Sequence, residues 1–440
     1  MAFGLVDSLA TTDALSAIFS DGSLLQAMLD FEASLASVQA AAGMIPQRAA
    51  DAIRAAATAD AFDAEAIARD ARESGTIVVP FVKALTAHVR AEDSESATFV
   101  HWGITSQDVA DSAMMLVLKP ARTVLAADHQ RLERLLRELS DRHARTVMLG
   151  RTLLQPAPPI TFGLKVAGWL AAIARSWKRL DAAFESALVL QFGGATGTLA
   201  ALGDRGPATA DALANRLGLG TAGAPWHTQR DRLGALVAAS GLYCASLGKM
   251  ARDIALLMQD EVGEVSEPGG GSSSMPHKRN PAGCAIALAA ATRTPALVAA
   301  FLSGMVQEHE RAVGGWHAEW PSVAAVVQST GAALASMTHV IGGLEVFPER
   351  MRTNIERTRG VVFAERAMML LAEAAGKEIA QDVVERALHE SRAKGRTFRE
   401  ALVGIPQIDS LLSAEQLSSI DSPEEYLGVS EVLRVRLLSE

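Results

Sequence analysis

Apolar residues recur at helical spacing from the start of the chain. After Ser23 they follow at alternating steps of four and three, which places them on one helix face: Leu24, Met28, Phe31, Leu35 and Val38. Gly43 and Pro46 end this helix. Shorter helical patterns follow near residues 47–57, 63–73 and 80–89. We therefore predict a helical N-terminal domain over residues 1–104.

Five much longer helical patterns make up the middle of the chain. They run over about residues 105–147, 160–190, 231–262, 281–312 and 321–344. Helices of this length imply a bundle that buries apolar stripes against other subunits. Pro120 is expected to kink the first of them. The fold prediction is all-α, with this central bundle over residues 105–347 and a C-terminal domain of shorter helices over residues 348–440.

Composition narrows the class of protein. Hydrophobic residues make up 49% of the 440 residues and aromatic residues 5%, which suits closely packed helices. The net charge of −9 argues against a nucleic acid partner. The long uncharged run 320–344 contains several Ser, Thr, Gln and His residues, so we expect a buried bundle helix and no membrane span. Two cysteines in apolar contexts and no N-terminal signal pattern predict a cytoplasmic protein.

A loop rich in glycine and serine precedes the fourth long helix. Residues 271–281 read GSSSMPHKRNP and follow Pro-Gly-Gly. Glycine and serine let such a loop open and close, and Pro281 suits the start of a helix. The helix's first amides, together with Lys278 and Arg279, form an anion trap. A run of Gly and Ser alone is usually a solvated linker, but the residues after Ser274 argue against that interpretation.

This stretch resembles the signature loop of the fumarase/aspartase superfamily, which includes adenylosuccinate lyases and 3-carboxymuconate cycloisomerases. The resemblance implies an all-helical homotetramer whose active sites each draw on three subunits. It also implies that Ser272 moves a proton at the carbon next to a carboxylate. Lys278 and Asn280 would stabilise the charge that results. Further substrate contacts are expected from the same loop, at Ser273, Met275 and Arg279.

Residues 101–108, HWGITSQD, hold a second candidate region. Thr105 and Asp108 have the spacing of a helix N-cap, and a cap alone is one explanation. The segment also resembles the superfamily's first conserved region. That resemblance implies that Thr105 and Ser106 hold a substrate carboxylate. His101 is either a substrate contact or a core histidine whose hydrogen bonds are satisfied.

Residues 150–159, GRTLLQPAPP, interrupt the helices with three prolines. Their resemblance to the superfamily's second region makes Arg151, Thr152 and Gln155 candidate substrate contacts. In the lyases, a histidine directly after this threonine protonates the leaving group. A glutamate seven residues past the signature lysine partners that histidine. The corresponding residues here are Leu153 and Ala285.

This double departure from the lyases has a chemical explanation. A lyase expels an amine or hydroxide, which are poor leaving groups that need a proton. A carboxylate has a pKa of about 4 and needs none at neutral pH, whether it leaves or attacks. Two apolar residues in place of the acid and its partner therefore favour an internal lactonisation.

Two tryptophans also favour an internal lactonisation over a lyase reaction. Residues 226–232 and 307–320 look like those of the cycloisomerases. Trp316 and Trp320 stand where adenylosuccinate lyases have polar or basic residues that help to hold the nucleotide phosphate. Indole rings cannot replace those donors, although they suit a flat conjugated ligand or plain packing.

These resemblances imply a cofactor-independent cycloisomerase that acts on a small anionic tricarboxylate. The substrate carboxylates need cations, and the candidates are Arg151, Arg230, Arg232, Arg279 and Arg311. Arg230, Arg232 and Arg311 are equally well explained as structural ion pairs. No histidine pair has a ligand spacing, so no metal is expected. The alternatives are a C–N lyase that releases fumarate, a cycloisomerase for another substituted muconate, and an inactive helical scaffold.

Overall fold

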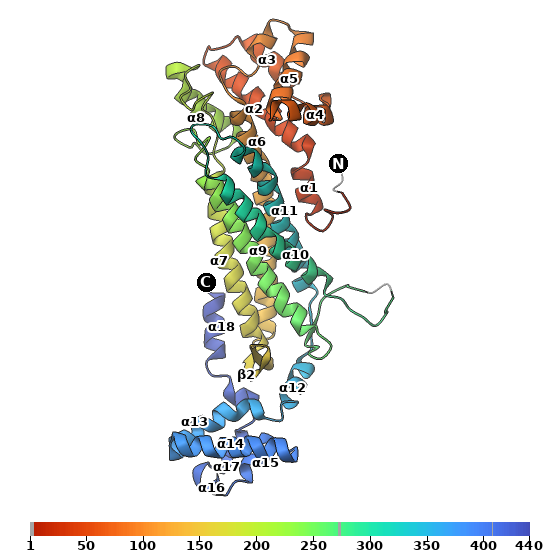
Figure 1. Ribbon diagram of the computed structural model, residues 1–440, viewed down its shortest axis with the longest axis vertical. Helices are drawn as coiled ribbons and strands as arrows, with labels where there is room; N and C mark the ends of the chain where they lie inside the picture. Colours follow the sequence, from red (N-terminus) through yellow and green to blue (C-terminus); the bar gives the residue numbers. More distant parts are fainter. Residues whose placement is uncertain (1–3, 272–273, 407) are drawn as a thin grey trace. The chain divides into compact units, whose positions relative to one another are not determined.

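The computed structural model describes residues 4–271, 274–406 and 408–440. The described residues form α-helices and two small antiparallel sheets, which confirms the all-α prediction (Figure 1). The N-terminal helices are α1 (Asp13–Ile18), α2 (Asp21–Ala41), α3 (Gln47–Ala56), α4 (Ala64–Ser74) and α5 (Val78–Glu92). The five long helices are α6 (Ser106–Arg142), α7 (Phe162–Ala187), α9 (Asp231–Leu257), α10 (Ala282–Gly304) and α11 (Gly315–Gly342). The shorter α8 (Gly206–Leu217) lies between α7 and α9 in the sequence.

The chain separates into two compact units, which we describe one at a time. Unit 1 comprises Met1–Gln130, Ser176–Gly248 and Ile286–Ser336. Unit 2 comprises Arg131–Arg175, Lys249–Ala285 and Met337–Glu440. The sequence-based division at residues 104 and 347 stays a prediction.

In unit 1, α2 packs against α3 and α8. Met28, Phe31 and Leu35 are buried as predicted, whereas the predicted Leu24 and Val38 are only half-buried. The buried face of α2 is rotated slightly from the predicted one, and it includes two polar side chains, Glu32 and Gln39. A buried polar group destabilises the fold unless it is hydrogen-bonded, and Glu32 and the Gln39 nitrogen do have partners within the unit.

Also in unit 1, α9 and α10 pack closely because glycines face the contact (Figure 1). Gly234, Gly241 and Gly248 are spaced by seven residues along α9. An added Cβ would lie 2.7 Å from Met305 Sδ, 2.8 Å from Val298 Cγ2 and 2.5 Å from Ala291 Cβ, respectively. The three facing residues have the same spacing in the opposite direction. The two helices are therefore antiparallel, and side chains larger than hydrogen at these three positions would separate them.

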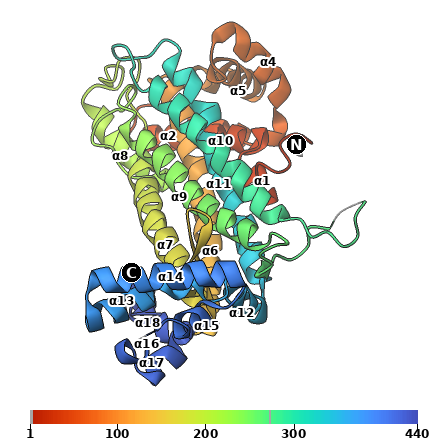
Figure 2. The same cartoon turned by 60° about the horizontal axis from the view of Figure 1, so that its bottom comes forward.

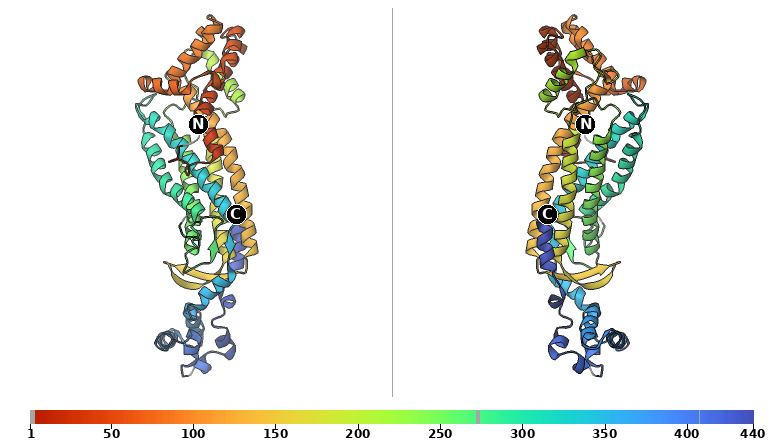
Figure 3. Two further views of the ribbon diagram at one scale, coloured as in Figure 1. Left: turned by 90° about the vertical axis from the view of Figure 1, so that its right-hand side faces the viewer. Right: turned by 90° about the vertical axis from the view of Figure 1, so that its left-hand side faces the viewer.

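Unit 2 contains a β-hairpin where the sequence suggested only a proline-rich break. Strand β1 (Val147–Thr152) pairs with β2 (Gln155–Thr161), with a bulge between Leu149 and Gly150 (Figure 3). The two turn residues, Leu153 and Leu154, have φ angles of 50° and 65°. Such a turn normally has Asn or Gly, because the left-handed conformation costs most other residues roughly 1–2 kcal/mol of conformational free energy. Leu153 and Leu154 are nevertheless 97% and 76% exposed, which makes this tip an unusual place for apolar residues.

The C-terminal part of unit 2 has its own apolar core. Its helices are α12 (Pro348–Glu356), α13 (Ala364–Ala375), α14 (Lys377–Lys394), α15 (Phe398–Val403), α16 (Ile408–Leu411), α17 (Ala414–Ser419) and α18 (Ser430–Leu438). α13, α14 and α15 pack together around buried residues such as Leu371, Val384 and Phe398 (Figure 2). The short strands β3 (Val265–Ser266) and β4 (Glu345–Val346) form the second sheet.

Three of the long helices are apolar and long enough to cross a membrane, by length and composition alone: α9, α10 and α11. In the most apolar windows of α9 and α11, 61% and 67% of the residues are buried inside the protein, as expected of bundle helices. The corresponding window of α10 is only 22% buried. One face of α10 is thus both apolar and uncovered within a single chain.

Candidate active site

The signature loop is closed at its base by backbone hydrogen bonds. The Asn280 N–H donates to the Gly270 carbonyl at 2.6 Å, and Gly271 forms an antiparallel bridge with Arg279. Gly270 has a φ of 73°, and a Cβ there would lie 1.9 Å from the Asn280 oxygen. Only glycine fits, which explains the second glycine of the Pro-Gly-Gly segment. Ser272 and Ser273 lie outside the described residues.

The cationic residues of this loop are open to solvent. Met275, Lys278 and Arg279 are exposed and Asn280 is half-buried. The Lys278 N–H donates to the Met275 carbonyl at 3.0 Å, which fixes the backbone between these two residues. The loop therefore holds two positive charges at its closed base, where an anion can reach them.

The amides at the start of α10 are not available to an anion, contrary to the expectation from the sequence. Gly283 and Cys284 donate their N–H groups to the two oxygens of Glu267, at 2.7 and 3.1 Å. Glu267 is buried, and its negative charge at the N-terminus of α10 suits the helix dipole. Within the loop, Lys278 and Arg279 therefore supply the positive charge in place of these amides.

At the start of α6, Thr105 and Asp108 make one of the two side-chain contacts of the predicted cap. The Thr105 N–H donates to Asp108 Oδ2 at 3.1 Å. The same buried carboxylate also accepts from the Gly193 and Gly194 amides at 2.9 and 2.8 Å, and His227 Nε2 lies 2.9 Å from its Oδ1. Asp108 thus fixes the start of α6 against two other segments of unit 1.

The Thr105 hydroxyl contacts a residue outside the first turn of α6. Thr105 Oγ1 accepts a short hydrogen bond from Arg311 Nη1. Two residues that the sequence nominated separately for carboxylate binding are therefore adjacent. Ser106 begins α6 next to them and is half-buried.

Arg230, by contrast, lies in a buried ion-pair network. It donates to both oxygens of Asp111 at 2.7 and 3.0 Å, and to Glu319 at 2.6 Å. Burial lowers the pKa of Arg230, but these two carboxylates outweigh that effect and raise it. All three guanidinium nitrogens are committed within unit 1. This geometry favours the structural alternative that the sequence left open for Arg230.

Arg151 is similarly engaged in unit 2. Its two terminal nitrogens donate to both oxygens of the buried Glu264, at 3.0 and 2.6 Å. Glu264 also accepts from Asn354 at 2.7 Å. Thr152 and Gln155 follow Arg151 at the hairpin tip and are exposed. Arg151 therefore anchors the β1–β2 hairpin, whose tip carries the other two candidate residues into solvent.

Two cavities are lined by other residues. One, of about 300 Å³, is lined by Trp316, His317 and Trp320 together with Arg72 and Thr76. The two indoles meet edge to face at 4.9 Å, and Trp316 Nε1 donates to Asp111 at 3.0 Å. The packing alternative for these tryptophans therefore accounts for much of their geometry.

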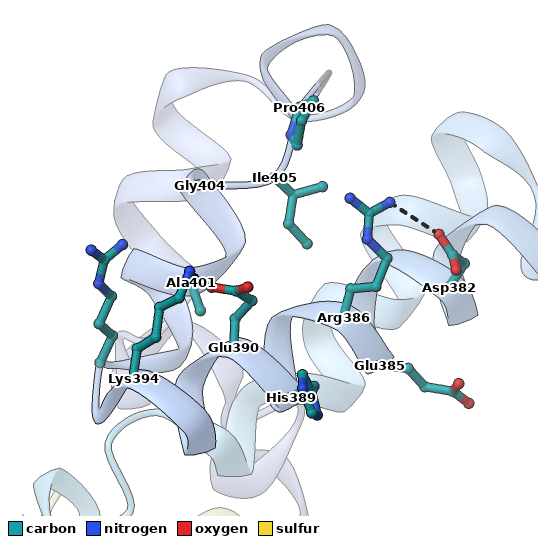
Figure 4. Close-up of a pocket in the computed structure, with 11 residues that line it drawn as sticks. Asp382, Glu385, Arg386, His389, Glu390, Lys394, Ala401, Gly404, Ile405 and Pro406 are labelled. Carbon is teal, nitrogen blue, oxygen red and sulfur yellow. Dashed lines mark hydrogen bonds and ion pairs between the residues drawn. The ribbon is translucent and has the colours of Figure 1, made fainter.

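The other cavity, of about 470 Å³, lies between α14 and the end of α15 (Figure 4). Four of its charged side chains form two ion pairs, since Arg386 contacts Asp382 at 3.3 Å and Lys394 contacts Glu390 at 2.6 Å. None of the predicted site residues lines it. Among the described residues, no group of three His, Cys, Asp or Glu side chains is arranged to hold a metal ion.

The comparison with known families agrees with these features. The sequence profile of the family described as "Lyase" matches residues 8–295. The chain belongs to this lyase family. A second profile, "Adenylosuccinate lyase C-terminus", matches residues 360–436. The superfamily suggested by the signature loop is thereby confirmed.

Within the lyase family, the chain is similar to cycloisomerases over nearly its whole length. It is 44% identical to the 3-carboxy-cis,cis-muconate cycloisomerase of Bradyrhizobium diazoefficiens, over 99% of this chain and 97% of that protein. The enzyme of the same name from Pseudomonas aeruginosa is also 44% identical, over 99% and 96%. The crystal structure of the 3-carboxy-cis,cis-muconate lactonizing enzyme of Pseudomonas putida matches with a TM-score of 0.94 and 42% identity, covering 99% of this chain and 98% of that one.

Sequence reasoning missed four buried carboxylates that organise these regions: Glu32, Asp111, Glu264 and Glu267. It also recognised Asp108 only as a cap residue and not as a junction between segments. For Glu32 the sequence holds a signal, because this acid interrupts an apolar face at helical spacing. Glu264 and Glu267 lie outside any periodic pattern, so their partners become visible only in three dimensions.

Proposed function

We propose that the chain is a cofactor-independent cycloisomerase that converts 3-carboxy-cis,cis-muconate to a carboxymuconolactone. One observation carries the proposal. The chain retains Lys278 and Asn280 of the signature loop, yet both positions of the lyase acid pair are apolar. Leu153 is at an exposed hairpin tip and Ala285 is exposed on α10. Packing in a core of the chain therefore does not explain why these two positions are apolar. The similarity to cycloisomerases along nearly the whole chain supports the same conclusion.

The chemistry follows from the loop residues. A substrate carboxylate oxygen forms a bond to one carbon of the diene, and the displaced electron pair moves onto a neighbouring carboxylate as an aci-form. Lys278 and Asn280 stabilise this second charge, since they offer a cation and an amide donor. A proton from Ser272 then reaches the carbon next to that carboxylate. Arg311 with Thr105 and Ser106 would bind another carboxylate of the substrate.

We further propose a homotetramer in the cytoplasm whose active sites are shared between subunits. The exposed face of α10 supports this arrangement, since its residues repeat at steps of three and four and are small: Ala282, Ala285, Ala289, Thr292, Ala296, Ala299 and Ser303. Small residues let a second helix approach closely. The exposed Leu153 and Leu154 would likewise be covered by another subunit, which would place Thr152 and Gln155 against its substrate.

The experiment is a pair of assays on the purified protein. With 3-carboxy-cis,cis-muconate, the ultraviolet absorbance of the conjugated diene should fall as the lactone forms. With adenylosuccinate, no fumarate should be released. Fumarate release without loss of diene would establish the C–N lyase alternative, and inactivity on both would favour another substituted muconate or an inactive scaffold.

A further inference from the structure

Glu32 is a carboxylate on the buried face of α2, with an exposure of only 2%. Its neighbours on that face are apolar, among them Leu25, Met28, Leu29 and Leu35. Burying a carboxylate in such surroundings is strongly unfavourable unless it is paired and hydrogen-bonded. Its partner therefore identifies what this charge does for the protein.

Both oxygens of Glu32 bind a single residue, His101. His101 Nδ1 lies 2.6 Å from Glu32 Oε1, and the His101 backbone N–H donates to Oε2 at 3.2 Å. His101 has a φ of 58°, a left-handed conformation that is uncommon for residues other than glycine. Two helical turns further along α2, Gln39 Nε2 donates to the Trp102 carbonyl at 2.8 Å. Two polar side chains of α2 thus hold the turn that carries His101.

This contact also decides which ring nitrogen of His101 is available. Nδ1 donates to Glu32, as a carboxylate can only accept. Nε2 has no hydrogen-bond partner in the part of the chain that the structure describes. The His101 side chain is 18% exposed, so this nitrogen is not sealed in the core. A histidine oriented by a carboxylate behind it resembles the arrangement that fixes the ring of many functional histidines.

The position of His101 matters because it is close in the sequence to two candidate residues for carboxylate binding. His101 is four residues before Thr105, whose hydroxyl accepts from Arg311. Arg230 already forms ion pairs with Asp111 and Glu319. Among the candidate residues of this unit, Arg232, Arg311 and His101 therefore remain as cationic groups, and Arg311 and His101 are the two tied to the Thr105 segment.

We propose that Glu32 is a positioning residue that presents His101 as an Nε2–H donor to a carboxylate of the substrate. The proposal rests on the proposed function for the identity of that substrate. Glu32 itself touches no substrate and acts through the ring of His101. In the absence of Glu32, the ring would lose its fixed orientation and the left-handed turn would lose its main support.

The charge environment of His101 gives the proposal a pH signature. The charged groups that act on His101 are Glu32 from α2 and Asp108 from α6, while Arg311 reaches the same segment through Thr105. Burial lowers the pKa of His101, but the charge and hydrogen bond of Glu32, with the charge of Asp108, raise it above its usual value. A raised pKa keeps the imidazolium present to higher pH. Anion binding should therefore weaken as the pH rises through this pKa.

The experiment measures the dissociation constant of tricarballylate, a saturated tricarboxylate that cannot lactonise, between pH 5.5 and 9 by calorimetry. Glu32→Gln is nearly isosteric and keeps an acceptor for Nδ1. We expect its binding to weaken at a lower pH than in the wild type, and each unit of displacement corresponds to about a tenfold loss on the alkaline side. At the acid end the two proteins should bind alike. Asp30→Asn, on the exposed side of the same helix, is the matched control and should leave the profile unchanged.

Two further readouts separate this role from a purely structural one. The ring signals of His101 in the nuclear magnetic resonance spectrum should titrate at lower pH in Glu32→Gln. In a His101→Asn background, which tolerates the left-handed turn, Glu32→Gln should no longer change the pH profile. An equal loss of affinity at every pH, or an unchanged titration of His101, would overturn the proposal. Because tricarballylate binding requires no turnover, this result is independent of whether the cycloisomerase assay succeeds.

Discussion

At the scale of single residues, Lys278 is the group on which the proposed chemistry depends most. It is exposed at the base of the signature loop, while the neighbouring α10 amides are occupied by Glu267. Lys278→Met should reduce kcat more than it raises KM, because charge on the acceptor carboxylate grows toward the transition state. Steady-state kinetics with 3-carboxymuconate, beside Arg279→Met as a neighbouring control, check this. An equal effect on tricarballylate affinity and on kcat would reduce Lys278 to a binding residue.

Arg230 should behave in the opposite way, because its partners are carboxylates of the protein. Arg230→Met leaves Asp111 and Glu319 buried without their cation, which destabilises a protein by roughly 3–5 kcal/mol. We expect a large fall in the thermal unfolding temperature, while the KM of the protein that remains folded changes little. Arg311→Met, whose contact is the Thr105 hydroxyl, should show the reverse pattern. A normal unfolding temperature with a raised KM for Arg230→Met would restore its role in substrate binding.

For single residues, the sequence identified the candidate site residues but did not identify the partners that several of them bind. Thr105, Arg311 and Lys278 were recognisable from their motifs, and the structure joins the first two directly. Motifs did not reveal that Arg151 and Arg230 are held by Glu264, Asp111 and Glu319. An arginine looks the same in the sequence whether a substrate or a buried carboxylate will pair with it. Only the folded chain shows which donors remain.

At the scale of elements, periodicity predicted the five long helices because each has one continuous apolar face. It placed the start of α11 at Pro321, whereas the helix begins at Gly315. Pro321 lies inside α11, where it removes one backbone hydrogen bond without ending the helix, so this residue did not mark the boundary. The β1–β2 hairpin escaped prediction because its turn has leucines where glycine or asparagine is usual.

The contact between α9 and α10 provides a prediction at this scale. Gly248→Val should destabilise the fold by about 1–3 kcal/mol, because its Cβ would lie 2.5 Å from Ala291 Cβ and the helices must separate. Chemical denaturation measures the change. Gly22→Ala near the start of α2 is the control, since an added Cβ there meets nothing within 4 Å. A stable Gly248→Val variant would show that this helix contact is not closely packed.

At the scale of the whole molecule, the exposed apolar face of α10 predicts an assembly. Ala289→Arg places a long charged side chain in the middle of the stripe of small residues. Sedimentation should show the wild type at about four times the 46.3 kDa mass of one chain, and the variant as smaller species without cycloisomerase activity. Gln381→Arg on the exposed side of α14 should remain tetrameric and active. A tetrameric Ala289→Arg protein would remove α10 from the interface.

The most direct measurement concerns the two positions that distinguish this chain from the lyases. Wild type and the double variant Leu153→His/Ala285→Glu are assayed side by side for loss of diene from 3-carboxymuconate and for fumarate release from adenylosuccinate. We predict lactone formation by the wild type and no fumarate. The double variant should gain no speed in lactonisation, because the attacking carboxylate is already ionised near neutral pH. Fumarate release by the wild type, or faster lactonisation by the double variant, would contradict the proposal that this enzyme is a cycloisomerase needing no leaving-group acid.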